Sequence, residues 1–224
     1  LNPQHRDSVA YLRVCSGRFE RDMQVEHPRT GRTIRLARPH KAFAAERETV
    51  DEALPGDVIG LVHHGGFAIG YRVCTGETLR FEPMPRFAPE HFAVLRNLET
   101  RRYKQFQQGV AQLEAEGAMQ VYAVPDAHRL EPVLGVVGRL QFDVVQFRLE
   151  NEYGVKTSLD VLPYTTARVV EAAPETLARL PWSLSKRVED ADGQVIALFT
   201  HAWTADNWET RYPVKLHEIG AGIG

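Results

Sequence analysis

The chain has 224 residues, of which 43% are hydrophobic and 25% charged, and its formal net charge is −2. That composition excludes a disordered or fibrous chain, and no run of about 18 apolar residues is present to cross a membrane. Cys15 and Cys74 form neither a CxxC motif nor a disulfide framework, so we expect reduced thiols in a cytoplasmic protein. The first ten residues also lack the apolar segment of a secretory signal.

Residues 1–84 are predicted to form a small, mainly β domain. Short apolar runs, several with period-two alternation, are separated by glycine and proline turns, which indicates a barrel or sandwich of short strands. The runs lie at residues 9–14, 23–25, 34–36, 58–62, 71–74 and 79–81. Pro83 and Pro85 interrupt strand pairing and mark a linker, so we expect the first domain to end at residue 84.

Residues 85–224 are predicted to form an α+β domain, because the hydrophobic period becomes helical from Phe87 onward. Two helices separate four strands in the order β-α-β-β-α-β, which is the order of a ferredoxin-like fold. The expected buried faces are Tyr103, Phe106, Val110 and Leu113 on the first helix, and Leu140, Val144 and Phe147, broadened by Val145 and Leu149, on the second. Gly117 and Gly154 are expected to end these helices. A C-terminal extension follows, with a helix at 174–180 and extended segments at 195–200 and 214–217.

The sequence lacks the common signatures of an enzyme. It contains no phosphate-binding loop, dinucleotide fingerprint, zinc-protease motif or nucleophile elbow. His63 and His64 lie at a predicted hairpin tip without a further Cys or His at ligand spacing, and Cys15 is expected to be a small buried side chain. We therefore predict no catalytic, cofactor-binding or metal-binding residue. The tryptophans are interpreted as packing anchors of the C-terminal extension: Trp182, Trp203 and Trp208.

One segment is distinctly basic. Five positive charges occur between residues 29 and 41 with no acidic residue among them: Arg29, Arg32, Arg35, Arg38 and Lys41. Ile34 and Leu36 are expected to turn inward, which would leave Arg32 and Arg35 pointing outward. Two interpretations stay open, a solvated hairpin face or a patch that contacts phosphate groups.

Several motifs resemble those of translational GTPases of the elongation factor G group. Ala53-Leu-Pro-Gly-Asp-Val-Ile-Gly-Leu61 resembles the second-domain signature in which a Pro-Gly-Asp turn leads into an apolar strand. The most specific segments are Gly135-Val-Val-Gly-Arg-Leu-Gln-Phe-Asp-Val-Val145 and Arg148-Leu-Glu-Asn-Glu-Tyr-Gly-Val155. Within the group, these segments and Trp208-Glu-Thr-Arg-Tyr-Pro213 are most similar to the peptide chain release factor 3 family.

The resemblance implies a translation-factor β-barrel at 1–84, lacking its first strand, followed by the third domain at 85–224, and no G domain. GTP and magnesium would bind in that absent domain, so this fragment would be no enzyme and hold no cofactor. Implied partners are the ribosome, through small-subunit rRNA and proteins, the protein's own G domain and, indirectly, a class-I release factor, with no membrane and no DNA. The five basic residues would contact rRNA. Alternatives are the matching domains of elongation factor G or a ribosomal protection protein, and an unrelated enzyme using His63, His64 or Cys15.

Overall fold

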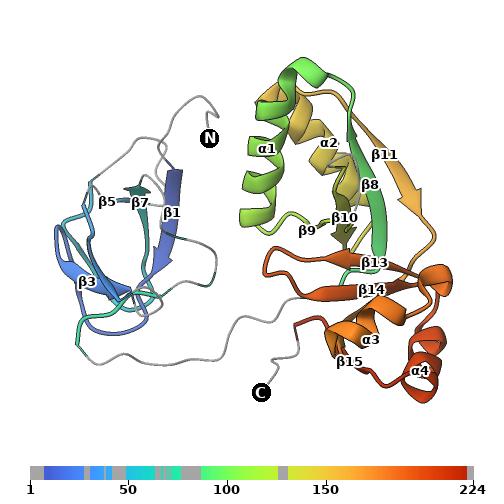
Figure 1. The fold of residues 1–224 in the computed structure, drawn as a ribbon. Coiled ribbons are helices and arrows are strands. Elements are labelled where there is room, and N and C mark those ends of the chain that lie inside the picture. The colour runs from blue at the N-terminus through green and yellow to red at the C-terminus, as the bar shows by residue number, and fades with distance from the viewer. Residues whose placement is uncertain are drawn as a thin grey trace. The chain divides into compact units, whose positions relative to one another are not determined.

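The structure, a computed structural model, describes residues 8–27, 31–37, 39–41, 49–63, 67, 70, 72–76, 87–125 and 131–220. It divides into two compact units, Leu1–Met84 and Pro85–Gly224 (Figure 1). No helix in the described part is long and apolar enough to span a membrane.

The first unit consists of short antiparallel strands around one small core. Strands β1 (Ser8–Arg13), β7 (Val58–His63) and β5 (Pro39–Lys41) form a sheet in the order β1-β7-β5. Two pairs accompany it, β2 (Phe19–Glu20) with β6 (Glu52–Ala53), and β3 (Gln24–His27) with β4 (Arg32–Arg35). The buried core residues are Phe19, Val25, Leu36, Ala53, Ile59 and Leu61.

Two of the strands predicted for this unit are not among its named strands, for different reasons. Of the segment at 71–74, the described residues 72–74 form no named strand, and Cys74 makes an isolated bridge with Glu26. The segment at 79–81 lies outside the described residues. Cys15, expected to be buried, is exposed, because β1 ends two residues before it and the chain turns there.

The Pro-Gly-Asp turn of the first unit is held by its own side chain. A carboxylate oxygen of Asp57 accepts a hydrogen bond from the Leu54 amide at 2.8 Å, and the Gly56 amide donates to the Val14 carbonyl at 2.8 Å. Gly56 has φ +103°, a conformation that favours glycine. Asp57 and Gly56 thus stabilise the turn that leads into β7.

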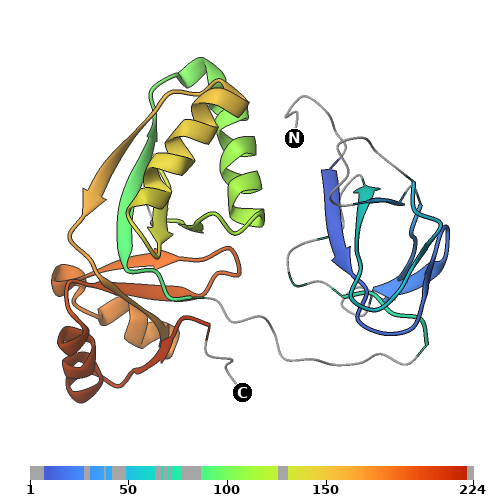
Figure 2. The ribbon, with the colours of Figure 1, turned by 180° about the vertical axis from the view of Figure 1, so that it is seen from behind.

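The second unit begins with a ferredoxin-like half. In chain order it contains β8 (His91–Asn97), the short 3-10 helix η1 (Thr100–Arg102), α1 (Tyr103–Ala115), β9 (Gln120–Tyr122), β10 (Val133–Val136), α2 (Leu140–Tyr153) and β11 (Thr157–Leu162). The antiparallel sheet has the order β11-β8-β10-β9, and both helices cover the same face of it (Figures 1 and 2). The predicted β-α-β-β-α-β order is confirmed. Gly154 ends α2 with φ +66°, as expected.

The predicted buried face of α2 is wrong at Leu140, Val144 and Phe147 and confirmed at Val145 and Leu149. Leu140, Val144 and Phe147 are 77%, 52% and 66% exposed, whereas Phe142, Val145 and Leu149 pack into the core against α1 and the sheet. The two sets share helical spacing, because apolar residues surround most of this helix. Periodicity alone therefore cannot decide which face turns inward.

The C-terminal extension forms a second sheet that completes the unit. Strands β12 (Thr166–Glu171), β13 (Ser185–Glu189), β14 (Val195–Phe199) and β15 (Lys215–Glu218) pair in the order β13-β14-β12-β15. Helix α3 (Pro174–Arg179), the 3-10 helix η2 (Trp182–Leu184) and α4 (Ala202–Arg211) accompany them. The predicted helix at 174–180 and edge strand near 214–217 are confirmed, whereas β12, β13 and α4 were not predicted.

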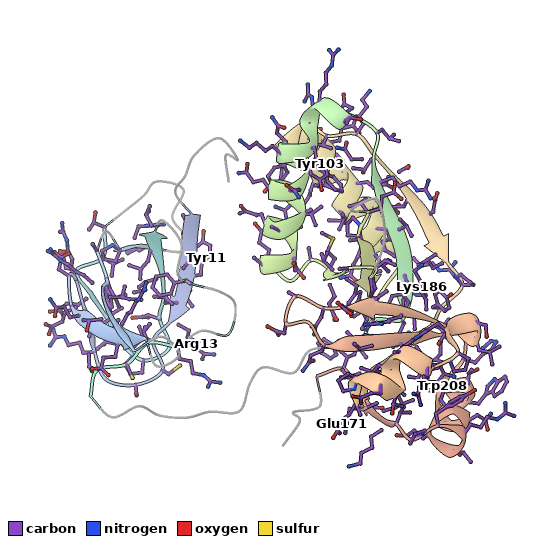
Figure 3. The ribbon with its side chains drawn as sticks, viewed as in Figure 1. Tyr11, Arg13, Tyr103, Glu171, Lys186 and Trp208 are labelled. Atoms are coloured by element: carbon purple, nitrogen blue, oxygen red, sulfur yellow. The ribbon has the colours of Figure 1, made fainter. Side chains whose placement is uncertain are left out.

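Both faces of this second sheet are buried. On one face, Ala167, Val188 and Leu198 pack with Phe92 and Tyr122 of the first sheet. On the other face, Trp208 of α4 packs edge-on against Phe199, with ring centroids 5.2 Å apart (Figure 3). Trp208 and the half-buried Trp182 are thus packing anchors, whereas Trp203 is 63% exposed and is not.

Candidate functional site

Among the described residues, no three His, Cys, Asp or Glu side chains gather where they could hold a metal ion. His63 is the last residue of β7, and His64 lies outside the described residues. Hydrogen bonds to basic partners explain the lowered pKa values of two carboxylates: Glu152, bonded to Arg148, and Glu171, bonded to His217 at 2.7 Å. The first is an ion pair and the second a hydrogen bond, and both are structural contacts.

The basic segment is divided by the fold. Arg32 and Arg35 lie on β4, opposite His27 and Gln24 of β3, while Lys41 ends β5 in another sheet. Leu36 is buried and Ile34 packs against the same core, as expected. Arg29 and Arg38 lie outside the described residues.

Arg32 and Arg35 differ in their surroundings. The expectation that both point away from the core side is wrong: residues three apart on a pleated strand leave opposite faces, so Arg32 shares the face of Ile34. The Arg35 Nε lies 3.2 Å from an Asp22 carboxylate oxygen, whereas Arg32 has no ion-pair partner among the described residues. Both side chains are exposed, but Arg32 offers the less compensated charge.

The most specific sequence signature has a structural role at the start of α2. The Gln141 Oε1 accepts hydrogen bonds from the Val137 and Gly138 amides, each at 2.9 Å, and its Nε2 donates to the Ala118 carbonyl at 3.2 Å. One side chain thus joins the β10–α2 turn to the segment after α1. Gly135 leaves room for Tyr122 and Pro89, since a Cβ there would lie 2.8 Å and 3.0 Å from their side chains.

Two surface features of the second unit were not predicted. The outer face of α2 exposes Leu140, Val144 and Phe147, and in Figure 2 this helix lies on the viewer's side of the sheet. The start of α1 is cationic, with Arg101, Arg102 and Lys104 nearly consecutive. The sequence itself carries the signal for that cluster, which is three cations within four residues.

Comparison with known proteins assigns both units. Residues 1–76 match the family "Elongation factor G domain 2", and residues 81–209 match "Class II release factor RF3, C-terminal domain". Relatives named peptide chain release factor 3 are 49% identical in Gloeobacter violaceus and 52% identical in Nostoc punctiforme, over 98% of this chain. A solved structure from Thermus thermophilus shares the fold, with TM-score 0.58 and 19% identity, over 83% of this chain and 27% of its own.

The fold and the signature residues define a translation-factor module, with an elongation factor G-type second domain followed by an α+β domain. The chain belongs to the class II release factor RF3 family. It spans 42% and 41% of the length of the two named relatives. Among the alternatives raised by the sequence, this match favours release factor 3 over elongation factor G, ribosomal protection proteins and an unrelated enzyme.

Proposed function

We propose that this chain is the ribosome-binding module of a peptide chain release factor 3. The observation that carries the proposal is the match to relatives of that name at about half identity across 98% of the chain. In this proposal a GTP-binding domain lies in the part of the relatives that this chain does not span. The nucleotide state set there, with its magnesium ion, would drive dissociation of the codon-reading class-I release factor after termination.

The module's task is mechanical. Two folded units transmit the nucleotide-dependent state to small-subunit rRNA and proteins in the cytoplasm, and the chain itself performs no chemistry. The proposal is supported by the match of both units to translation-factor families. Co-sedimentation with purified ribosomes tests the proposal, because the chain should bind and should compete with a full-length relative. Failure to bind or compete would contradict it.

The basic segment is proposed to contact rRNA phosphates, with Arg32 as its strongest described contributor. Arg29, Arg38 and Lys41 would extend the contact, while Asp22 already compensates part of the Arg35 charge. Such contacts position a module without reading bases. Arg32→Glu should therefore weaken ribosome binding more than Arg35→Glu, and each lost contact should flatten the log–log salt slope by about 0.7–0.9.

A control for that experiment lies in the same unit. Arg21 is exposed and pairs with Asp51 at 3.2 Å, so Arg21→Glu makes the same charge change elsewhere on the unit's surface. If Arg32→Glu, Arg35→Glu and their double variant bind like Arg21→Glu, the segment is only a solvated face.

The chain by itself is proposed to bind no nucleotide. Phosphate loops hold nucleotide through a glycine-rich backbone nest followed by Lys and Ser or Thr, and this sequence contains no such motif. Calorimetric titration with GTP and magnesium should give no saturable heat. Saturable binding would assign the chain a function of its own.

A further inference from the structure

One end of the second unit gathers positive charge. Arg101 and Arg102 lie in η1, Lys104 follows in the first turn of α1, and Lys156 directly precedes β11. The Leu98 amide donates to the Lys156 carbonyl at 3.0 Å, so these segments are adjacent in space. Residues 87–224 carry 14 Lys and Arg against 18 Asp and Glu, so this cationic end belongs to a net-negative unit.

The four cations fall into two kinds. Arg102 is used by the fold, because its Nη1 donates to the carbonyl of Gly154 at the end of α2 and its Nε lies 3.9 Å from a Glu99 oxygen. A cation at that position also compensates the negative end of the α2 dipole. The side chains of Arg101, Lys104 and Lys156 are exposed and, among the described residues, make no ion pair or hydrogen bond, although the Lys156 backbone amide donates to a Glu99 oxygen at 3.2 Å.

Two of these exposed cations, Arg101 and Lys104, lie at the N-terminal end of α1, where positive charge does not stabilise a helix. Helices prefer acidic side chains at their first turn, since the helix dipole is positive there. The first turn of α1 contains no acidic residue, and Arg101 and Lys104 lie within two residues of Tyr103, the first residue of the helix. Exposed cations there raise the electrostatic energy of the helix end, since Glu99, the N-cap of η1, is already paired with Arg102. An external anion would lower that energy.

We propose that Arg101, Lys104 and Lys156 form a surface that binds the phosphodiester backbone of RNA. The inference rests on the proposed ribosome-binding function and adds a second contact surface, on the other unit from the basic segment. Charge complementarity selects RNA, because phosphate contacts need only exposed cations. Protein interfaces instead have an apolar and aromatic centre, and apart from Leu98 this end presents mainly charged side chains.

The test compares two triple variants with the same change in net charge. The first replaces Arg101, Lys104 and Lys156 with Gln. The control replaces three exposed cations of the second sheet and its helices with Gln: Arg179, Arg211 and Lys215. Binding of each to purified ribosomes and to a 16-base-pair RNA duplex is measured across a salt series.

The first variant should bind both ribosomes and duplex at least tenfold more weakly at low salt. Its log–log salt slope should be flatter by about 2, since each lost phosphate contact contributes about 0.7–0.9. The control should retain the slope of the unaltered chain. The first variant should also melt no lower than the unaltered chain, because the replaced charges oppose the α1 dipole, whereas Arg102→Gln should melt lower.

Three other outcomes of this experiment can be distinguished from one another. Equal binding by the first variant and the control overturns the inference and leaves the proposed function standing. Weaker ribosome binding with unchanged duplex binding also overturns it and indicates an acidic protein partner. If the chain fails to bind ribosomes but the duplex depends on these cations, the surface is supported and the proposed function fails.

Discussion

Arg148 makes one hydrogen bond to the end of α1 and two within its own helix, α2. Its Nη1 lies 2.6 Å from a Glu116 oxygen, and its Nε and Nη2 hold both carboxylate oxygens of Glu152 at 2.6 Å and 2.8 Å. Such forked pairs are stronger than single contacts. The bond to Arg148 lowers the pKa of Glu152, and burial raises the pKa of the neighbouring Tyr153.

Replacing Arg148 should reduce both stability and its dependence on pH. Arg148→Met is expected to cost about 1–2 kcal/mol, a value discounted because the side chains are one quarter to one third exposed. Since the folded pKa of Glu152 lies below its ordinary value of 4.5, its contribution is present above that pH and is lost as pH falls below it. Urea unfolding from pH 3 to 7 should show a shallower acid limb for the variant.

The control for Arg148 is Arg139→Met, an exposed cation at the start of the same helix. It should leave the free energy of unfolding and its pH dependence nearly unchanged. An acid limb as steep in Arg148→Met as in the unaltered chain would contradict the role given to this network.

Two phenylalanines of α2 provide a second contrast at the residue scale. Phe142 is 5% exposed within the core, so Phe142→Ala should lower the free energy of unfolding by about 3–5 kcal/mol. Phe147 is 66% exposed, so Phe147→Ala should cost less than about 0.5 kcal/mol. Urea melts of both variants decide the orientation of the helix. Similar losses for the two would mean that α2 is turned differently.

At the scale of elements, α1 and α2 approach closely at a glycine. A Cβ on Gly109 would lie 2.7 Å from the Leu149 side chain and 3.0 Å from the Tyr153 ring. Because Leu149 is fully buried, it has little room to move. Gly109 in the middle of α1 thus lowers the helix propensity but allows the two helices to pack closely.

The substitution Gly109→Ala tests whether the cost of overpacking exceeds the gain in helix propensity. Alanine should gain about 1 kcal/mol of helix propensity and lose about 1–3 kcal/mol to overpacking, so we expect no stabilisation and a net loss of up to about 2 kcal/mol. The matched control is Gly138→Ala, where a Cβ meets nothing within 4 Å. Chemical denaturation of both variants gives the comparison. Stabilisation of Gly109→Ala would show that the helices can separate without cost.

At the scale of the whole chain, the two sheets of the second unit share one core. Phe92, Tyr122 and Val133 of the first sheet pack against Ile196 and its neighbours on the second. The Ala123 and Glu189 backbones also exchange hydrogen bonds of 2.8 Å. The ferredoxin-like half is therefore incomplete without the C-terminal extension.

Truncation should expose this dependence. A chain ending at residue 164 is expected to bind a hydrophobic dye and aggregate, because it uncovers Phe92, Tyr122 and Val133. Residues 85–224 alone should fold, since they form a separate compact unit with their own core. Near-ultraviolet circular dichroism and dye binding distinguish the two. A monomeric, cooperatively folded chain of 1–164 would show that the second sheet is only an addition.

The sequence alone determined the features that depend on local chemistry. Period-two and helical spacing identified β3, β4 and α1, and Gly154 marked the end of α2 because glycine tolerates its left-handed conformation. Motifs such as that around Gln141 were specific enough to indicate the family. The ferredoxin-like fold was predicted from the order of the expected helices and strands along the chain.

Only the tertiary structure decided which surfaces are buried and which charges are compensated. Helix α2 has apolar residues on several faces, so packing against the sheet, and not spacing, turned Phe142 inward and Phe147 outward. Likewise, Asp22 pairs with Arg35, and the Gly154 carbonyl accepts a hydrogen bond from Arg102. In both cases the two partners are well separated along the chain. Burial and charge pairing are long-range properties, because they depend on which neighbours the fold brings within a few ångströms of each side chain.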